Sequence, residues 1–264
     1  MKRDLGYKLT ILVLFLVIVL QWIYIIQSRP RKAPLVVRPK PLVALKGKIA
    51  IVIDDWGYNL QNLPIIEQVH FPLTVSILPN LGYSGEVSRQ LHARGFEVIL
   101  HLPMEPHEKY RLEKNTIMVS FSEGEIKNII EHDLGNIIYA KGVSNHMGSL
   151  ATEDTRVMGV VFKELKKRRL YFLDSVVSGK SICADLAQKM KLSFTRRDVF
   201  LDNVETPEYI KDQIRKLKLR SRMKGEAVGI GHDRRITLQV LREMMPEMEK
   251  EGYRFVFISD LVKQ

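Results

Sequence analysis

From residue 48 onward, short apolar runs alternate with longer segments in which apolar residues recur every three or four positions. The first pattern predicts buried strands and the second predicts amphipathic helices, because the two elements repeat their faces with different periods. We expect strands over 48–54, 73–78, 96–100, 142–145, 170–174, 198–201, 227–231 and 254–258. We expect helices over 59–69, 86–94, 122–139, 152–169, 180–192 and 236–251, and one long helix from 206 onward.

Local signals support several helix starts. Ser122 with Glu125 three positions later forms a capping-box pattern. Thr206 followed by Pro207 suits the N-cap and first helical position, where a missing backbone N–H does no harm. Thr152 is the expected cap of the helix that follows it.

Strand and helix alternation over roughly 215 residues predicts a parallel sheet, open or closed into a barrel. Polar residues follow the predicted strands at their carboxyl ends: Asp54 and Asp55, His101, His146, Asp174 and His232. Because the carboxyl ends of barrel strands meet on one face, we expect these side chains to lie close together.

These residue types point to a metal site. The single cysteine, Cys183, excludes a disulfide within the chain and a cysteine-based zinc cluster, so His, Asp or Glu must supply any ligands. Imidazole nitrogens with a carboxylate suit zinc, and an open fourth position leaves room for water. We expect adjacent Asp54 and Asp55 to point in opposite directions, one toward the metal and one toward substrate. A solvated turn is the alternative.

An uncharged run of 18 residues, 9–26, precedes this region. As a helix it would be about 27 Å long, close to the thickness of a bilayer core. We therefore expect a cytoplasmic tail and transmembrane anchor over 1–27, with a cleaved signal peptide as the alternative. The proline-rich, basic stretch 28–47 predicts an extended linker, and 48–264 the barrel domain.

The net charge of +11 is concentrated near this segment. Residues 1–47 contain nine Lys or Arg and one acidic residue, whereas the rest contains 32 basic and 29 acidic residues. Basic residues beside an apolar helix suit anionic lipid headgroups. The domain shows no basic stripe interleaved with aromatic residues, so we expect no nucleic-acid partner.

Five motifs together resemble those of the divergent polysaccharide deacetylase family. They are IDDWG (53–57), HLPMEP (101–106), NHMGS (145–149), LDS (173–175) and GIGH (229–232). The resemblance extends over residues 48–262, and the family is similar to carbohydrate esterases of the NodB type. It implies a distorted (β/α)7-type barrel outside the cytoplasmic membrane, here preceded by one N-terminal transmembrane helix.

The resemblance also implies roles for single residues. Asp54 matches the general base of active NodB relatives, Asp55 a metal ligand, and His232 the late histidine that acts as acid. Relatives take two further ligands from a His-x-x-x-His stretch, but here His101 is followed by Glu105. Either Glu105 is a ligand or His146 replaces it. We favour His146, because it lies at a strand end.

Two further positions are expected near substrate. Asn145 stands where relatives place an arginine. Asp174 is expected either to orient a histidine or to bind substrate.

The implied reaction is metal-assisted hydrolysis of an acetyl amide or ester on an envelope glycan, with zinc as the expected metal. The altered ligand set keeps a second hypothesis open, in which an inactive barrel binds a glycan or a protein partner in the envelope. A phosphoester hydrolase is a third and weaker reading, because the sequence contains no glycine-rich phosphate loop.

Overall fold

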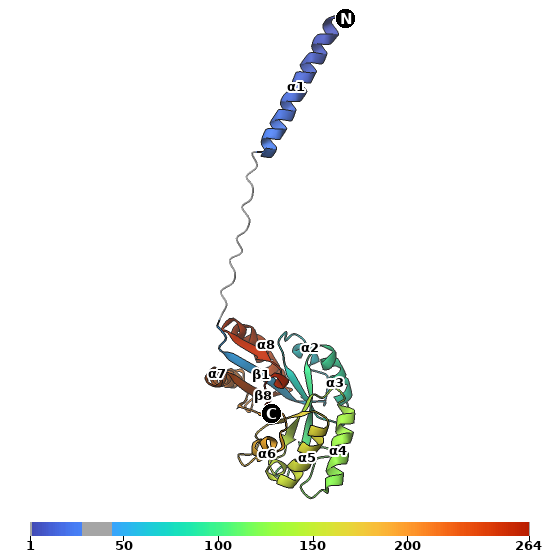
Figure 1. Cartoon of the computed structure of the whole chain (residues 1–264), viewed down its shortest axis with the longest axis vertical. Coiled ribbons are helices and arrows are strands. Elements are labelled where there is room, and N and C mark those ends of the chain that lie inside the picture. Colours follow the sequence, from blue (N-terminus) through green and yellow to red (C-terminus); the bar gives the residue numbers. More distant parts are fainter. Residues whose placement is uncertain (1, 28–43, 264) are drawn as a thin grey trace. The chain divides into compact units, whose positions relative to one another are not determined.

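The computed structural model (Figure 1) describes residues 2–27 and 44–263, in two units, Met1–Leu42 and Val43–Gln264. The first contains the helix α1 (Lys2–Gln27), whose described side chains, Tyr7 and 12–27, are exposed. No helix among the described residues is both long and apolar enough to cross a membrane, so the transmembrane helix predicted over 9–26 is not supported. Most of the predicted linker, 28–47, lies outside the described residues.

The second unit alternates strands and helices along its whole length. Its strands are β1 (Gly47–Trp56), β2 (Thr74–Ile77), β3 (Glu97–Met104), β4 (Gly142–Met147), β5 (Tyr171–Asp174), β6 (Phe194–Arg196), β7 (Val199–Phe200), β8 (Glu226–His232) and β9 (Tyr253–Val256). Its α-helices are α2 (Leu63–Ile66), α3 (Ser84–Ala93), α4 (Glu123–Asn136), α5 (Thr155–Lys167), α6 (Cys183–Met190), α7 (Pro207–Lys224) and α8 (Arg235–Lys250). Two 3-10 turns, η1 (Ala151–Glu153) and η2 (Ile258–Asp260), complete it.

All the strands join one parallel sheet in the order β6-β5-β4-β3-β2-β1-β8-β7, and β9 pairs with the start of β1. The sheet curls, with helices on its outer side (Figure 1). Its edge strands β6 and β7 do not pair with each other within the described chain, so the barrel is open along this seam. The expected seven-stranded barrel is therefore a nine-stranded, incompletely closed one.

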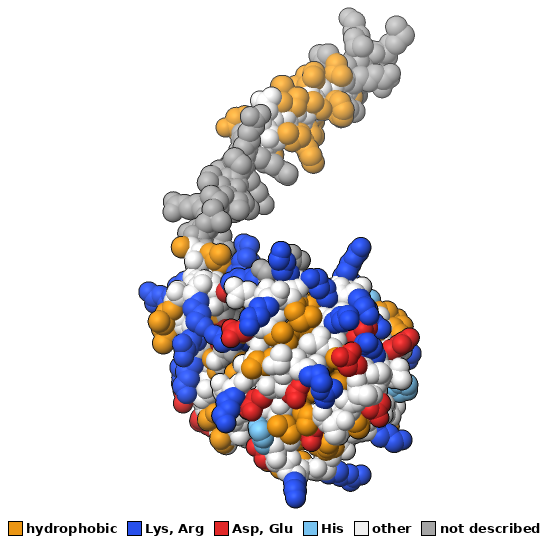
Figure 2. Space-filling model, turned by 60° about the horizontal axis from the view of Figure 1, so that its bottom comes forward, with side chains coloured by type: hydrophobic (Ala, Val, Ile, Leu, Met, Phe, Trp, Pro, Cys, Tyr) orange, Lys and Arg blue, Asp and Glu red, His pale blue; other side chains and the backbone are white. Residues whose placement is uncertain are grey.

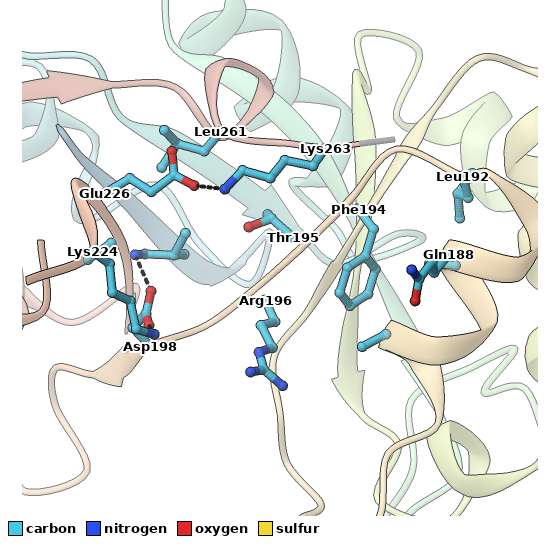
Figure 3. A pocket seen from close by; sticks show the side chains of 14 residues that line it. Gln188, Leu192, Phe194, Thr195, Arg196, Asp198, Lys224, Glu226, Leu261 and Lys263 are labelled. Carbon is cyan, nitrogen blue, oxygen red and sulfur yellow. Dashed lines mark hydrogen bonds and ion pairs between the residues drawn. The ribbon is translucent and has the colours of Figure 1, made fainter.

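One isolated β-bridge and several side-chain ion pairs lie near this seam. Phe194 and Lys263 exchange two backbone hydrogen bonds of 2.9 and 3.0 Å. The same Lys263 pairs with Glu226, and Lys224 pairs with Asp198 at 2.7 Å (Figure 3). A cavity of about 460 Å³ lies between these groups.

Both faces of the sheet are buried, as the apolar runs predict. Along β1, Ile49, Ile51 and Ile53 pack outward against the helices, whereas Ala50 and Val52 fill the interior of the curl. Among the described residues, every buried apolar side chain lies between Ile49 and Leu261, so the second unit has a hydrophobic core of its own.

Several predicted elements differ from those in the structure. The helix expected over 59–69 is only α2, because the Asn59 side chain accepts the Gln61 N–H and turns the chain before it. Asp154, rather than Thr152, caps α5 by accepting the Val157 N–H at 2.8 Å. Strand β6 was not predicted. Strands β3 and β4 are longer than expected, so His101 and His146 lie within strands.

Candidate metal centre and active site

Asp54 and Asp55 lie at the carboxyl end of β1, at a bulge in its pairing with β2. The register shifts between Ile53 and Trp56, which gives β1 one residue more than its neighbour. Asp55 takes up the extra residue with φ 67°, in the left-handed region. As a result both carboxylates approach His101, whose Nε2 is 3.7 Å from Asp54 Oδ2 and 3.3 Å from Asp55 Oδ1. The expectation that the two aspartates point in opposite directions was wrong.

Three potential ligand atoms converge on one point beside this bulge. Asp55 Oδ1 is 3.3 Å from His101 Nε2 and 3.1 Å from His146 Nδ1, and the three groups offer atoms within 4.8 Å of one another. The two imidazole rings stand edge to face at 72°. Asp55 Oδ1 is buried and makes no hydrogen bond of good geometry.

These spacings fit a divalent metal. Tetrahedral zinc ligands lie about 2.0–2.2 Å from the ion and therefore roughly 3.3 Å from each other. An oxygen buried between two ring nitrogens without hydrogen-bond geometry is what such an ion would bind. Asp55, His101 and His146 are the residues that would hold it.

A pair of buried hydroxyls orients His101. Its Nδ1 lies 2.8 Å from Ser144 Oγ, which lies 2.7 Å from Ser76 Oγ. Occupying Nδ1 in this way directs Nε2 toward the two carboxylates, as outer partners of metal-binding histidines commonly do. Neither serine was predicted, because small hydroxyl residues inside strands give no sequence signal.

The bulge gives the two aspartates opposite electrostatic properties. Burial raises the pKa of Asp54, with a further contribution from Asp55, against the lowering effect of His101. Burial also tends to raise the pKa of Asp55, but the nearby imidazoles of His101 and His146 outweigh it and hold that pKa well below its usual range. Asp54 is thus the better proton acceptor, and Asp55 the better permanent anion.

On the other side of β1, His232 ends β8 and is held by a buried carboxylate. Its Nδ1 is 2.7 Å from Asp202 Oδ1, and its backbone N–H donates to Asp202 Oδ2 at 2.8 Å. Thr237 Oγ1 also donates to Oδ2, at 2.6 Å. Burial lowers the pKa of His232, but the hydrogen bond and charge of Asp202 more than offset this and raise it.

Asp202 is the one site residue that strand-end reasoning should have found. It follows β7, just as the other polar residues follow their strands, but the predicted strand over 198–201 was weak. Next to it, the Phe200 ring stacks on His232 with centroids 5.8 Å apart, and the Arg197 guanidinium lies 3.6 Å from the Phe200 centroid. His232, the candidate proton donor, is therefore held by its hydrogen bond with Asp202 and by stacking on Phe200.

Glu105 and Asn145 make contacts that stabilise loops. Glu105 Oε2 accepts the Val119 N–H at 2.5 Å, away from the three convergent ligand atoms. Asn145 Oδ1 accepts the Ser175 N–H, and its Nδ2 donates to the Met147 carbonyl, both at 2.8 Å. Of the two alternatives for the missing ligand, the geometry favours His146 over Glu105.

Asp174 also has a local role. Its two oxygens accept the Val176 N–H and the Ser181 hydroxyl, both at 2.7 Å, which closes the loop after β5. In the described part of the chain it makes no hydrogen bond or ion pair with a histidine, so the structure gives no support for an orienting role.

Relatives of known sequence carry the same domain. The uncharacterized protein YibQ of Escherichia coli (strain K12) is 37% identical over 201 residues, which are 76% of this chain and 63% of that protein. The chain thus spans less than two thirds of the length of that relative. An uncharacterized protein of Haemophilus influenzae is 29% identical over 197 residues, covering 75% of this chain and 70% of that one.

Solved structures share the fold at low sequence identity. An uncharacterized protein from Agrobacterium tumefaciens C58 superposes with a TM-score of 0.79 at 21% identity, over 83% of this chain and 90% of that one. A family 4 carbohydrate esterase from Streptomyces lividans, solved with acetate, gives 0.51 at 14% identity, over 81% and 94%. A CE4 family pseudoenzyme from Bacillus anthracis gives 0.50 at 14% identity, over 81% and 65%.

The family model described as divergent polysaccharide deacetylase matches residues 51–262, nearly the whole of the curled sheet and its helices. The resemblance inferred from the motifs is confirmed, and the chain belongs to the divergent polysaccharide deacetylase family.

Proposed function

We propose that this protein is a metal-dependent hydrolase that removes acetyl groups from a glycan of the cell envelope. One observation carries the proposal: Asp55, His101 and His146 present three ligand atoms beside the free carboxylate of Asp54. His232, at the end of the adjacent strand β8 and held by the buried Asp202, supplies a second titratable group at the same edge.

The proposed chemistry combines the three ligand candidates on one side of Asp54 with His232 on the other. Asp55, His101 and His146 would hold a divalent metal, for which zinc is the best match, and the metal would lower the pKa of a bound water toward about 7. Asp54, whose pKa is raised, accepts the proton of the attacking water. His232, protonated and held by Asp202, donates a proton to the departing amine as the C–N bond breaks. The products are acetate and a free amine.

We propose further that the domain acts on the outer side of the cytoplasmic membrane, where the N-terminal segment holds it. The exposed apolar side chains of α1, such as Leu16 and Trp22, support association with lipid. Cell fractionation, combined with protease digestion of spheroplasts, tests the location. A domain that stays with the soluble cytoplasm would refute it.

A second candidate is an inactive barrel that binds glycan. Its support is that a CE4 family pseudoenzyme shares the fold, and that Glu105 stands where a second histidine would complete the ligand set of active relatives. In this case the same site would bind a sugar without cleaving it.

The deciding experiment measures metal content and acetate release on the same purified protein. We expect one equivalent of metal per chain and acetate release from N-acetylated glucosamine oligomers or peptidoglycan. Chelation should abolish the release and zinc should restore it. Metal and glycan binding without acetate release would favour the inactive barrel, and no metal binding would refute the metal centre.

A further inference from the structure

The exposed side of α7 combines basic and apolar side chains. Six of the eleven residues in 214–224 are Lys or Arg and none is acidic. Two large apolar side chains lie among them, Leu219 at 57% and Met223 at 72% exposure. They are four positions apart, so they lie on the same face of the helix.

The opposite side of α7 is fixed to the domain. Ile210, Ile214 and Leu217 are fully buried against the sheet, and Ser221 Oγ donates to the Lys48 carbonyl of β1 at 2.9 Å. The helix therefore cannot turn to bury Leu219 or Met223. Its basic and apolar side is presented permanently.

Several of the cations on this side lack a carboxylate partner. Arg215 pairs with Asp212 and Lys224 with Asp198. Lys216, Arg220 and Arg222 form no ion pair with any described residue. Figure 2 shows Lys and Arg side chains gathered along the left edge of the domain, the side on which Figure 1 places α7.

A groove adjoins these residues. It has a volume of about 390 Å³ and runs between α7 and the edge strand β7. Its lining includes Tyr209, Lys216, Leu219, Arg220 and Met223. The same cations and apolar side chains thus border a hollow that can take a polar headgroup.

We propose that this α7 face, defined by Lys216, Leu219, Arg220, Arg222 and Met223, binds the surface of an anionic lipid membrane. Unpaired cations beside flexible apolar side chains match an interface in which phosphates meet the charges and acyl chains meet Leu219 and Met223. Nucleic acid would instead call for exposed aromatic side chains on which bases stack. The five residues of this face include no aromatic, and Tyr209 in the adjoining groove is half-buried. The proposal is independent of any catalytic activity.

The test uses residues 43–264, which contain the complete core and lack α1. Thermal unfolding of this fragment and of the full chain is compared first, and we expect one cooperative transition at the same temperature in both. We expect it to sediment with vesicles of equal parts phosphatidylglycerol and phosphatidylcholine, but not with pure phosphatidylcholine. Binding should weaken as salt rises, because ions screen exposed charges.

Charge and apolar contributions are separated by two variants. The triple variant Lys216→Glu, Arg220→Glu, Arg222→Glu should lower the partition coefficient at least about 100-fold, since each basic residue near an anionic surface contributes roughly fivefold. The double variant Leu219→Gln, Met223→Gln should lower it about tenfold or more. Both keep helix-forming residues on an exposed surface.

A matched control changes the same charge elsewhere. Arg89, Lys163 and Lys189 are exposed on α3, α5 and α6 and form no ion pair within the described chain. Their replacement by Glu should lower binding less than about tenfold. Three results with vesicles would overturn the proposal: no binding to the anionic vesicles, an equal loss in the control triple, or no effect of the apolar double variant. Equal affinity for soluble polyglutamate would also overturn it, because it would indicate a general polyanion surface.

Discussion

Asp54 of β1 and His232 of β8 are direct register partners on neighbouring strands. The pairing places a carboxylate of raised pKa and an imidazole of raised pKa at the same edge of the sheet. His101 and His146, two of the metal-ligand candidates, come from strands on the other side of β1. The proton acceptor Asp54 therefore lies between the proton donor and these ligands.

The ligand assignment predicts which substitutions remove metal. Asp55→Ala and His146→Ala should each lower metal affinity by about 100-fold or more, because each deletes one of three convergent ligand atoms. Glu105→Gln is the matched control and should keep the metal, since Glu105 contacts Val119 instead. Metal content after dialysis, measured beside the thermal unfolding temperature, checks this. Full occupancy in both alanine variants would contradict the assignment.

The role of His232 predicts a separation of metal binding from turnover. His232→Ala should retain the metal and lose at least about 100-fold in kcat, the usual contribution of a general acid. Metal analysis and acetate release from the same preparation are compared. If metal and turnover fall together, His232 is itself a ligand.

The Asp202 contact predicts the pH dependence. Asp54 must be ionised and His232 protonated, so the rate should follow a bell whose alkaline limb lies above the usual imidazole pKa of 6.5. Asp202→Asn removes the charge that raises the pKa of His232, and the alkaline limb should move to lower pH. NMR titration of the ring measures the same shift without substrate. An unmoved ring pKa would contradict this account.

The same pair predicts a stability window. A raised imidazole pKa contributes stability that is complete below pH 6.5 and is lost as pH rises through the folded-state value. The lowered pKa of Asp202 contributes stability above about pH 3.8 that is lost as pH falls through its folded-state value. The cost of Asp202→Asn in free energy of unfolding should therefore be largest between these limits. Urea unfolding at several pH values tests it, and a cost independent of pH would count against the pair.

Close packing at Gly142 predicts a destabilising alanine. A Cβ there would lie 2.3 Å from the Tyr171 ring, so Gly142→Ala should cost about 1–3 kcal/mol through overpacking. Gly159→Ala is the control, because the Gly159 site on α5 is open and alanine favours a helix by up to about 1 kcal/mol. Urea midpoints of both variants should move in opposite directions.

The sequence predicted the convergence of three ligand candidates, because parallel strands deliver their ends to one edge. Asp55, His101 and His146 follow from that rule. The bulge at Asp55 does not, since a left-handed φ at a non-glycine residue depends on tertiary packing. Asp202 directly follows the strand predicted over 198–201 and obeys the same rule, but it was not included among the site residues.

The open seam between β6 and β7 has a consequence for motion. No strand ladder joins β6 to β7 among the described residues, where the Phe194–Lys263 bridge, the Lys263–Glu226 ion pair and side-chain contacts of Arg197 hold the seam. Strand β1, in contrast, pairs along its length with β2 or β8 on either side. Local opening costs least where the fewest cooperative bonds must break. Amide protons of β6 and β7 should therefore exchange with solvent sooner than those of β1, as expected if the sheet opens locally at this seam.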